Sequence, residues 1–144
     1  MKNSIYENGV YIYADRKLYK PEEFSGKEGK VVVVFGSDAF EVSPEQIENA
    51  TWQEAMEFAK SKGGNLPDRM QRMIMWKYNE QIQMALEKIG GTQLGEDLEW
   101  LCEELSSHYA WIFNGYYGYV VNNGKYYTYT GRPLLDFQFD ELVD

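Results

Sequence analysis

His108 is the only histidine of the chain, and Ser106 and Ser107 precede it directly. Histidine can shuttle protons near neutral pH, and beside a serine it could activate a nucleophile. Neighbouring residues of a strand point to opposite faces, however, and no nucleophile motif surrounds these serines. We therefore expect His108 to be structural or incidental, and the chain to be no enzyme.

Carboxylates make up the second pattern that could do chemistry. Glu96, Asp97 and Glu99 are followed closely by Glu103 and Glu104. Hard cations such as Ca²⁺ bind clustered carboxylate oxygens. The spacing is not that of an EF-hand loop, and a run of charge is usually a solvated face. We expect no metal site here.

Two further side chains are expected to be structural. Cys102 is the only cysteine, so it cannot form an internal disulfide, and there is no Cys/His cluster for zinc. A buried, inert thiol is the expectation. Arg132 is expected to pair with an acidic residue near a sheet edge, for which Asp136 is one candidate. The chain has no glycine-rich phosphate loop, and we expect no cofactor.

Aromatic residues are concentrated near the C-terminal end. Nine of the 23 in the chain lie within one short stretch: Tyr109, Trp111, Phe113, Tyr116, Tyr117, Tyr119, Tyr126, Tyr127 and Tyr129. Tyrosine, asparagine and glycine are what recognition loops favour. Cross-strand packing over a core is the alternative, and we expect it for Trp111 and one strand face. The predicted ligand-binding residues are Tyr116, Tyr117, Asn122, Asn123, Tyr109 and Tyr127.

The charge of the chain restricts its partners. The net charge is −9, and residues 90–144 alone carry nine acidic and two basic groups. Without a basic patch, we expect no binding to nucleic acid. No apolar run approaches membrane-spanning length, and Met1–Glu7 lacks the apolar core of a signal peptide. We expect a cytoplasmic protein as synthesised; a virion-associated protein released by lysis would look the same.

The N-terminal part reads as short strands. Gly9–Tyr13 and Lys30–Phe35 are rich in β-branched and aromatic residues, and the five apolar residues of the second predict burial on both faces. Residues 18–20 and 39–42 are predicted to be their hairpin partners. Residues 43–50 are predicted to be a polar connector.

Two helices are predicted next. Thr51 and Glu54 form a capping box before one helix, and Gly63-Gly64 ends it. Asp68 is predicted to cap a second helix, whose apolar spacing continues over about five turns to Ile89. Its methionine-rich stripe is interpreted as core rather than as a groove.

From residue 100 the pattern has period 2, which predicts an antiparallel meander. Asn123-Gly124 is the dipeptide preferred by a type I′ hairpin turn. If that turn is used, Val121 faces Tyr126, Tyr119 faces Thr128 and Val120 meets Tyr127. Asn114-Gly115 offers a competing turn.

Strands, then helices, then strands indicate an α+β fold with an antiparallel sheet. The length is that of one ordinary domain. We expect a single domain over residues 1–144, with N-terminal strands in 1–50, two helices in 51–91 and the aromatic meander in 92–144.

Several pieces of the sequence follow a known order and spacing. They are Ala50–Ala59, Gly63–Pro67, Ala85-Leu86 with Ile89–Leu94, Ser106–Asn114, Gly118–Val120 with Lys125, and Gly131–Leu134. Together, from about Thr51 to Phe137, they resemble the C-type lectin-like fold in its bacterial and phage form. That resemblance implies two helices packed against a twisted antiparallel sheet.

The family includes phage and bacterial surface-binding proteins, variable proteins diversified by retroelements, and domains related to the formylglycine-generating fold. The segment that is usually "YWSS" reads Glu99–Glu103 here. The calcium signatures and disulfide cysteines of animal lectins are absent, so the resemblance implies no calcium-dependent sugar site. A second cysteine for formylglycine chemistry is absent as well.

The leading hypothesis is a non-enzymatic binding module that recognises a protein or carbohydrate surface through the meander loops, in a phage or mobile-element setting. The alternative is a structural or virion-type assembly component that oligomerises through the same surface. A fold alone is a weak basis for function, because function depends on the site.

Overall fold

The computed structural model describes residues 6–142, so the predicted lack of a signal peptide falls partly outside the described residues. The chain is α+β, with three α-helices and two five-stranded sheets among the described residues. These elements belong to two compact units. The first comprises residues 6–44, 78–93 and 135–142, and the second comprises residues 45–77 and 94–134.

The sheet of the first unit contains the predicted N-terminal strands. They are β1 (Gly9–Ala14), β2 (Lys17–Tyr19), β3 (Lys30–Phe35) and β4 (Asp38–Val42), with β10 (Leu134–Asp136) at one edge, in the order β10-β4-β3-β1-β2. Val31 to Val34 of β3 are fully buried, as the apolar run predicted, whereas Phe35, the fifth residue of that run, is exposed. The short helices of this unit are η1 (Pro21–Glu23) and η2 (Phe139–Glu141).

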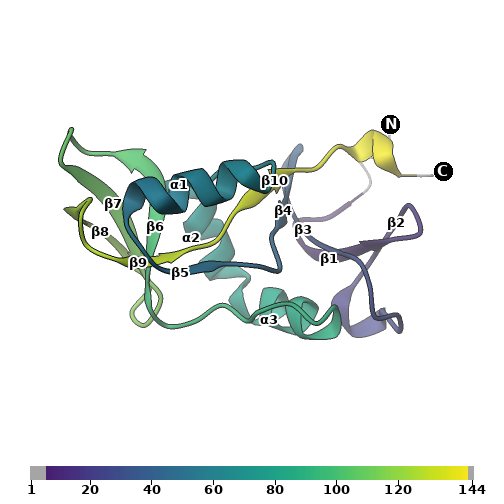
Figure 1. Ribbon diagram of the computed structural model, residues 1–144. Helices are drawn as coiled ribbons and strands as arrows, with labels where there is room; N and C mark the ends of the chain where they lie inside the picture. Colours follow the sequence, from purple (N-terminus) through teal and green to yellow (C-terminus); the bar gives the residue numbers. More distant parts are fainter. Residues whose placement is uncertain (1–5, 143–144) are drawn as a thin grey trace. The chain divides into compact units, whose positions relative to one another are not determined.

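The sheet of the second unit positions the candidate site. Its strands are β5 (Ile47–Ala50), β6 (Leu98–Glu104), β7 (Tyr109–Asn114), β8 (Tyr119–Gly124) and β9 (Tyr129–Gly131), in the order β5-β9-β6-β7-β8 (Figure 1). The β6-β7-β8 meander is antiparallel, whereas β9 lies parallel to β6. The prediction of a mere connector over residues 43–50 was wrong, because β5 pairs with β9 there.

The first helix, α1 (Trp52–Ser61), confirms its sequence signals. The Thr51 side chain accepts from the Glu54 amide at 3.3 Å, and the Glu54 carboxylate accepts from the Thr51 amide at 2.8 Å. This reciprocal pair satisfies two of the amides that a helix start leaves without intrahelical partners. Asp68 likewise exchanges hydrogen bonds with Gln71 at the start of the next helix.

The predicted second helix is two helices. They are α2 (Arg69–Lys77) and α3 (Asn79–Lys88), separated at Tyr78, whose backbone is not helical (φ −106°, ψ 26°). Neither Pro nor Gly marks this break, so the apolar spacing alone could not reveal it. The two helices belong to different units.

A four-residue loop over residues 115–118 joins β7 to β8, so the register predicted from Asn123-Gly124 was wrong. The competing Asn114-Gly115 forms no type I′ turn either, because Asn114 pairs with Tyr119 and only Gly118 of the loop has a positive φ. Val121 pairs with Ile112, Val120 with Phe113, and Tyr119 with Asn114. This register places Val120 and Val121 beside buried residues of β7. Burial of strand faces sets strand register, and here it outweighs the preference of Asn123-Gly124 for a turn.

Helices cover both faces of the second sheet. On one face Ala110 and Ile112 pack with Trp100 and with Ala55 and Ala59 of α1. On the other face Phe113 contacts Trp76 of α2, with ring centroids 5.7 Å apart. Trp111, predicted to be a core residue, is only half-buried, whereas its neighbour Phe113 on the same face is fully buried.

None of the helices in the described part of the chain is long and apolar enough to cross a membrane.

Gly118 provides a test of the hairpin turn. Its φ is +80°, and a side chain there would overlap the Trp76 indole. Gly118→Ala should therefore lower the free energy of unfolding by about 1–3 kcal/mol in urea titrations. The control is Gly36→Ala, where φ is +66° but open space surrounds the position. A loss at Gly118 no larger than at Gly36 would contradict the packing described here.

Candidate functional site

The tip of the β7–β8 hairpin is held by one side chain. Asn114 Oδ1 accepts from the amides of Tyr116 and Tyr117, both at 2.9 Å. The Tyr116 and Tyr117 rings meet edge to face at 4.8 Å, and Tyr117 stacks on Tyr119 at 5.9 Å. We call Tyr116, Tyr117 and Tyr119 the tip group. Its backbone is fixed while its rings face outward.

A second set of rings lies where the chain leaves β8. Tyr126 and Tyr127 stack at 4.8 Å, and Tyr127 stacks on Tyr129 at 6.3 Å. Asn123 Nδ2 donates to the Tyr129 hydroxyl at 2.6 Å. A hydrogen bond with Tyr127 raises the pKa of Tyr126 above its ordinary value. We call Tyr109, Tyr126 and Tyr127 the base group.

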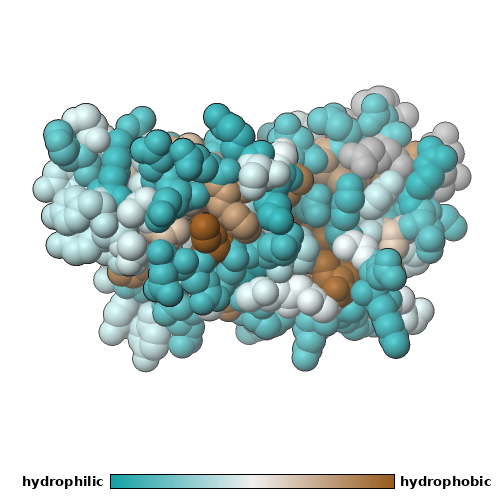
Figure 2. All heavy atoms as spheres, viewed as in Figure 1, coloured by the Kyte–Doolittle hydropathy of each residue, from teal (hydrophilic) through white to brown (hydrophobic). Residues whose placement is uncertain are grey.

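The tip and base groups together form the tyrosine surface, which holds six of the twelve tyrosines of the chain. Each of the six is between 46% and 74% exposed. Figure 2 shows this part of the molecule in pale colours, between the strongly polar and the apolar ends of the scale. A phenol combines an apolar ring with one hydroxyl, which suits it to surfaces that bind.

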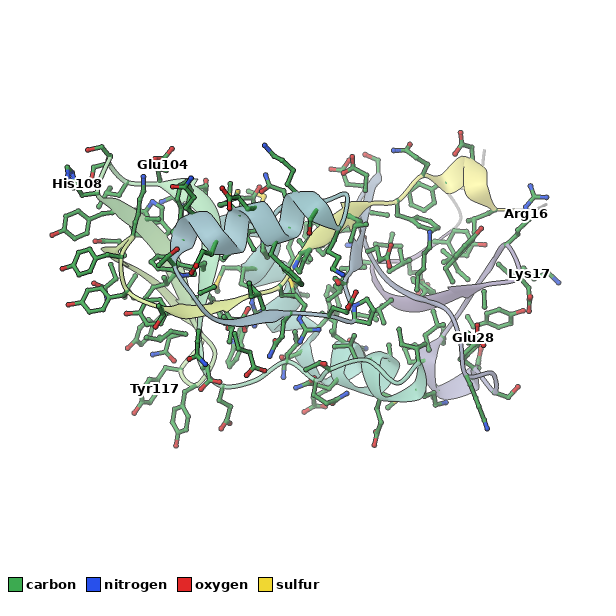
Figure 3. All side chains as sticks on the ribbon, in the orientation of Figure 1. Arg16, Lys17, Glu28, Glu104, His108 and Tyr117 are labelled. Carbon is green, nitrogen blue, oxygen red and sulfur yellow. The ribbon has the colours of Figure 1, made fainter. Side chains whose placement is uncertain are left out.

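The predicted residues divide between the two groups. Tyr116 and Tyr117 lie in the tip group, and Tyr109 and Tyr127 lie in the base group. In Figure 3, Tyr117 and His108 mark the two ends of the hairpin. The pairs Asn114–Tyr119 and Tyr109–Gly124 are five residues apart along the ladder. At ~3.4 Å per residue the groups are about 17 Å apart. Because side chains alternate along a strand, Tyr109 and Tyr119 lie on opposite faces of the β7–β8 ribbon.

The two predicted asparagines differ. Asn122 is exposed, opposite Trp111. Asn123 is half-buried, and its Oδ1 accepts from the Gly124 amide at 2.8 Å while its Nδ2 bonds Tyr129. Asn123 therefore shapes the base group and is not a free recognition residue.

A depression of about 330 Å³ lies beside β9 in the second unit. It is lined by Glu48, Asn49, Asp97, Leu98, Thr128, Tyr129 and Thr130. Its polar groups come from β5, from Asp97 just before β6, and from Thr128 and the adjoining β9. No sequence pattern predicted it, because only the pairing of β9 between β5 and β6 brings these segments together.

A buried ion pair fixes α2 to the sheet that carries the hairpin. Arg72 donates to both oxygens of Glu99, at 3.0 and 3.1 Å, and its guanidinium lies 4.0 Å from the Phe113 ring centroid. Arg132 is buried nearby and donates to Gln46 at 3.0 Å. Burial lowers the pKa of Arg132 to about 10, with Glu99 opposing this shift and Arg72 adding to it.

Other acidic residues are engaged as well. Glu103 pairs with Arg69 at 2.9 Å, and Glu104 pairs with Lys125. Partial burial acts to raise the pKa of Glu103, but hydrogen bonds from Arg69 outweigh this effect and lower it. Among residues 6–142, no three His, Cys, Asp or Glu side chains lie close enough together to hold a metal ion.

The serine–histidine contact belongs to a local turn. Ser107 Oγ lies 2.9 Å from His108 Nδ1, and Ser106 Oγ accepts from the His108 amide at 3.3 Å. All three residues are exposed in the loop between β6 and β7. The His108 carbonyl accepts from the Lys125 amide at 2.9 Å, which connects this loop to the base group.

No family model matches the sequence, and no curated protein matches it significantly.

Two residues of the tyrosine surface were not among the predicted ligand-binding residues. Tyr126 is the most exposed of the six, at 74%, and Tyr119 is 47% exposed. Tyr119 is exposed although it pairs with Asn114 in β8. The incorrect hairpin register placed Tyr126 within a paired strand. With β7 and β8 joined at residues 115–118, Tyr126 instead lies in the loop after β8.

Two substitutions in β6 compare how much a buried and an exposed ion pair contribute to the free energy of unfolding. Glu99→Gln leaves buried Arg72 and Arg132 without their carboxylate, so the free energy of unfolding should fall by about 3–5 kcal/mol. Glu103→Gln removes an exposed pair, for which the expected loss is under about 1 kcal/mol. Urea denaturation of both variants measures the difference, and equal losses would contradict it.

Cys102 should react slowly in the folded protein. Burial, aided by Asp68 and Glu103, raises the pKa of its thiol from 9.0 to about 11. At pH 8 the thiolate is then about a hundredfold scarcer than in an ordinary thiol. Alkylation by iodoacetamide should be slower by about that factor than in urea, and should accelerate about tenfold per pH unit below the pKa. Equal folded and unfolded rates would refute this.

Proposed function

We propose that this protein is a non-enzymatic binding module whose tyrosine surface recognises a protein or glycan surface. The observation that carries the proposal is the set of six exposed tyrosines on one hairpin and its following loop. Scattered exposed apolar residues need no explanation, whereas an exposed aromatic group of this density indicates an interaction site.

The turn geometry supports recognition with little loss of entropy. Asn114 fixes the amides of the tip, and Asn123 fixes the start of the loop that carries Tyr126 and Tyr127. Tyrosine has few rotatable bonds for its contact area. A surface already ordered before binding gives up less conformational freedom on binding, which favours affinity.

The C-type lectin-like resemblance belongs to the same proposal. Of its pieces, α1 with its capping box, the Gly63–Pro67 link and strand β7 belong to the second unit, whereas Ala85-Leu86 lies in α3 of the first unit. We propose a calcium-independent member of that fold. Because the resemblance is to bacterial and phage members, we also propose a phage or mobile-element setting.

An assembly component is the second candidate. The same exposed rings would then be covered by other subunits, as in a virion-type oligomer. This candidate is favoured by exposed Val121 and Tyr119, which lie on the outermost strand of the sheet. Apolar side chains at a sheet edge are suited to contact with another chain.

The binding proposal is tested by replacing the two most exposed rings of the tip. Tyr116→Ala combined with Tyr117→Ala should change the free energy of unfolding by no more than about 0.5 kcal/mol, because both rings face solvent. Binding to a glycan array or to intact bacterial cells should weaken at least about tenfold. Met84→Ala, an exposed apolar side chain of α3, serves as the matched control.

Treatment of the cells before binding separates the two kinds of partner. Protease should abolish binding if the partner is a protein, and periodate should abolish it if the partner is a glycan. Undiminished binding by the double variant would show that the tip is not the site. Binding to neither probe, together with a stable multimer that buries the tyrosines, would favour the assembly component.

A further inference from the structure

Strand β8 is an open edge of the second sheet (Figure 1). It pairs with β7 over six consecutive residues without a bulge. The opposite edge, β5, is irregular: its register shifts between Ile47 and Ala50, and Asn49 has a positive φ of 53°. Bulges and distortions protect sheet edges from unwanted pairing, and β8 has neither.

The ladder shows which backbone groups of β8 point away from the sheet. The Lys125 amide donates to the His108 carbonyl, which makes Tyr109–Gly124 a pair without mutual hydrogen bonds. Pairs of the two kinds alternate in an antiparallel ladder. Val121 therefore bonds to β7, whereas the N–H and C=O groups of Val120 and Asn122 face outward.

The open part of this edge ends at Gly118 on one side and at Gly124 on the other. The Gly118 amide donates to the Asn114 carbonyl, and the Gly124 amide donates to Asn123 Oδ1. Within the part of the chain that the structure describes, no hydrogen bond is made by the outward groups of Val120 and Asn122. The open edge thus consists of two donors and two acceptors.

Charge does not protect this edge either. From Asn114 to Gly124 the sequence contains no Lys, Arg, Asp, Glu or Pro. Those are the residues that natural edge strands use to prevent pairing. Val121 and Tyr119 are 37% and 47% exposed beside the open groups.

We propose that β8 is a self-association edge, where two copies of this chain pair antiparallel about a twofold axis. In this arrangement Val120 of each copy pairs with Asn122 of the other, through four backbone hydrogen bonds. The axis passes between the two Val121 residues. Each copy contributes the same strand, so the interface is closed and the assembly stops at a dimer.

Only one register of this antiparallel pairing uses all the free backbone groups of β8. Centring the axis on Val120 would place Asn122 opposite Gly118, and centring it on Asn122 would place Val120 opposite Gly124. The amides of both glycines are already used within the chain. Only the axis at Val121 matches all open donors with open acceptors.

A second copy suits this edge despite the net charge of −9. The paired strands oppose no like charges, because residues 114–124 carry none. Charges elsewhere on the two copies are screened beyond about 8 Å at physiological ionic strength. The pairing does not require the tyrosine surface to bind any ligand.

Analytical ultracentrifugation of the full chain at about 1–500 µM tests the association. The mass of the wild type should rise from monomer towards dimer. Asn122→Pro removes one outward N–H without touching the β7 ladder, so this variant should remain monomeric. Asn122→Ala keeps the N–H and should dimerise like the wild type.

Cross-linking tests the register independently, including the case in which the proline variant fails to fold. In a Cys102→Ser background, Val121→Cys places two thiols across the axis, at the ~4.5 Å Cα separation of such a pair. Oxidation should give a disulfide-linked dimer. Tyr119→Cys places its thiols about 14 Å apart and should not cross-link.

A wild type that stays monomeric at the highest concentration would overturn the proposal. So would equal cross-linking of the two cysteine variants, or dimers formed by a folded Asn122→Pro protein. A dimer that survives Asn122→Pro but is lost in the Tyr116→Ala, Tyr117→Ala variant would place self-association at the tip group.

Discussion

The second unit depends on a buried ion pair, in a place where the burial of charge costs free energy. Arg72, Glu99 and Arg132 are each at most 5% exposed, and the carboxylate of Glu99 compensates guanidinium groups that water does not reach. Removal of an ion from water costs several kcal/mol unless a partner is held in good geometry. The two hydrogen bonds from Arg72 to Glu99 meet that condition and fix α2 against β6.

That attachment has consequences for the hairpin. Phe113 of β7 lies under the Arg72 guanidinium and beside Trp76, so the strand that leads into the turn is buried on this face. On the other face Ile112 packs in the α1 core. With β7 held on both sides, β8 and the loops around it are free to present their side chains to solvent. A rigid support and an exposed rim are the arrangement that binding loops require.

Two surfaces of different chemistry result. The tyrosine surface offers rings and hydroxyls, whereas the edge of β8 offers backbone donors and acceptors. They lie on the same hairpin. Turns orient most rings of the tyrosine surface, whereas the β7–β8 ladder determines which backbone groups of β8 face outward. A partner could therefore occupy one without occupying the other.

Much of this architecture could be read from local patterns. Strands β1 and β3, the capping box at Thr51 and Glu54, and the end of α1 at Gly63-Gly64 follow from residue periodicity and end signals. Such signals act over a few residues, so no knowledge of the rest of the chain is needed. Tyr116 and Tyr117, named from the aromatic pattern as ligand-binding residues, are exposed in the loop between β7 and β8.

Tertiary structure decided the rest. Asn123-Gly124 has a local preference for a tight turn, yet both residues lie in β8. The pairing of buried Ile112 and Phe113 with Val121 and Val120 sets the register instead. Strand β5 has no signal of its own because β9 supplies its hydrogen bonds. By itself the sequence determined where chain elements can begin and end. Packing between distant segments determined the register and the exposed edge, because burial is a property of neighbours that lie far apart along the chain.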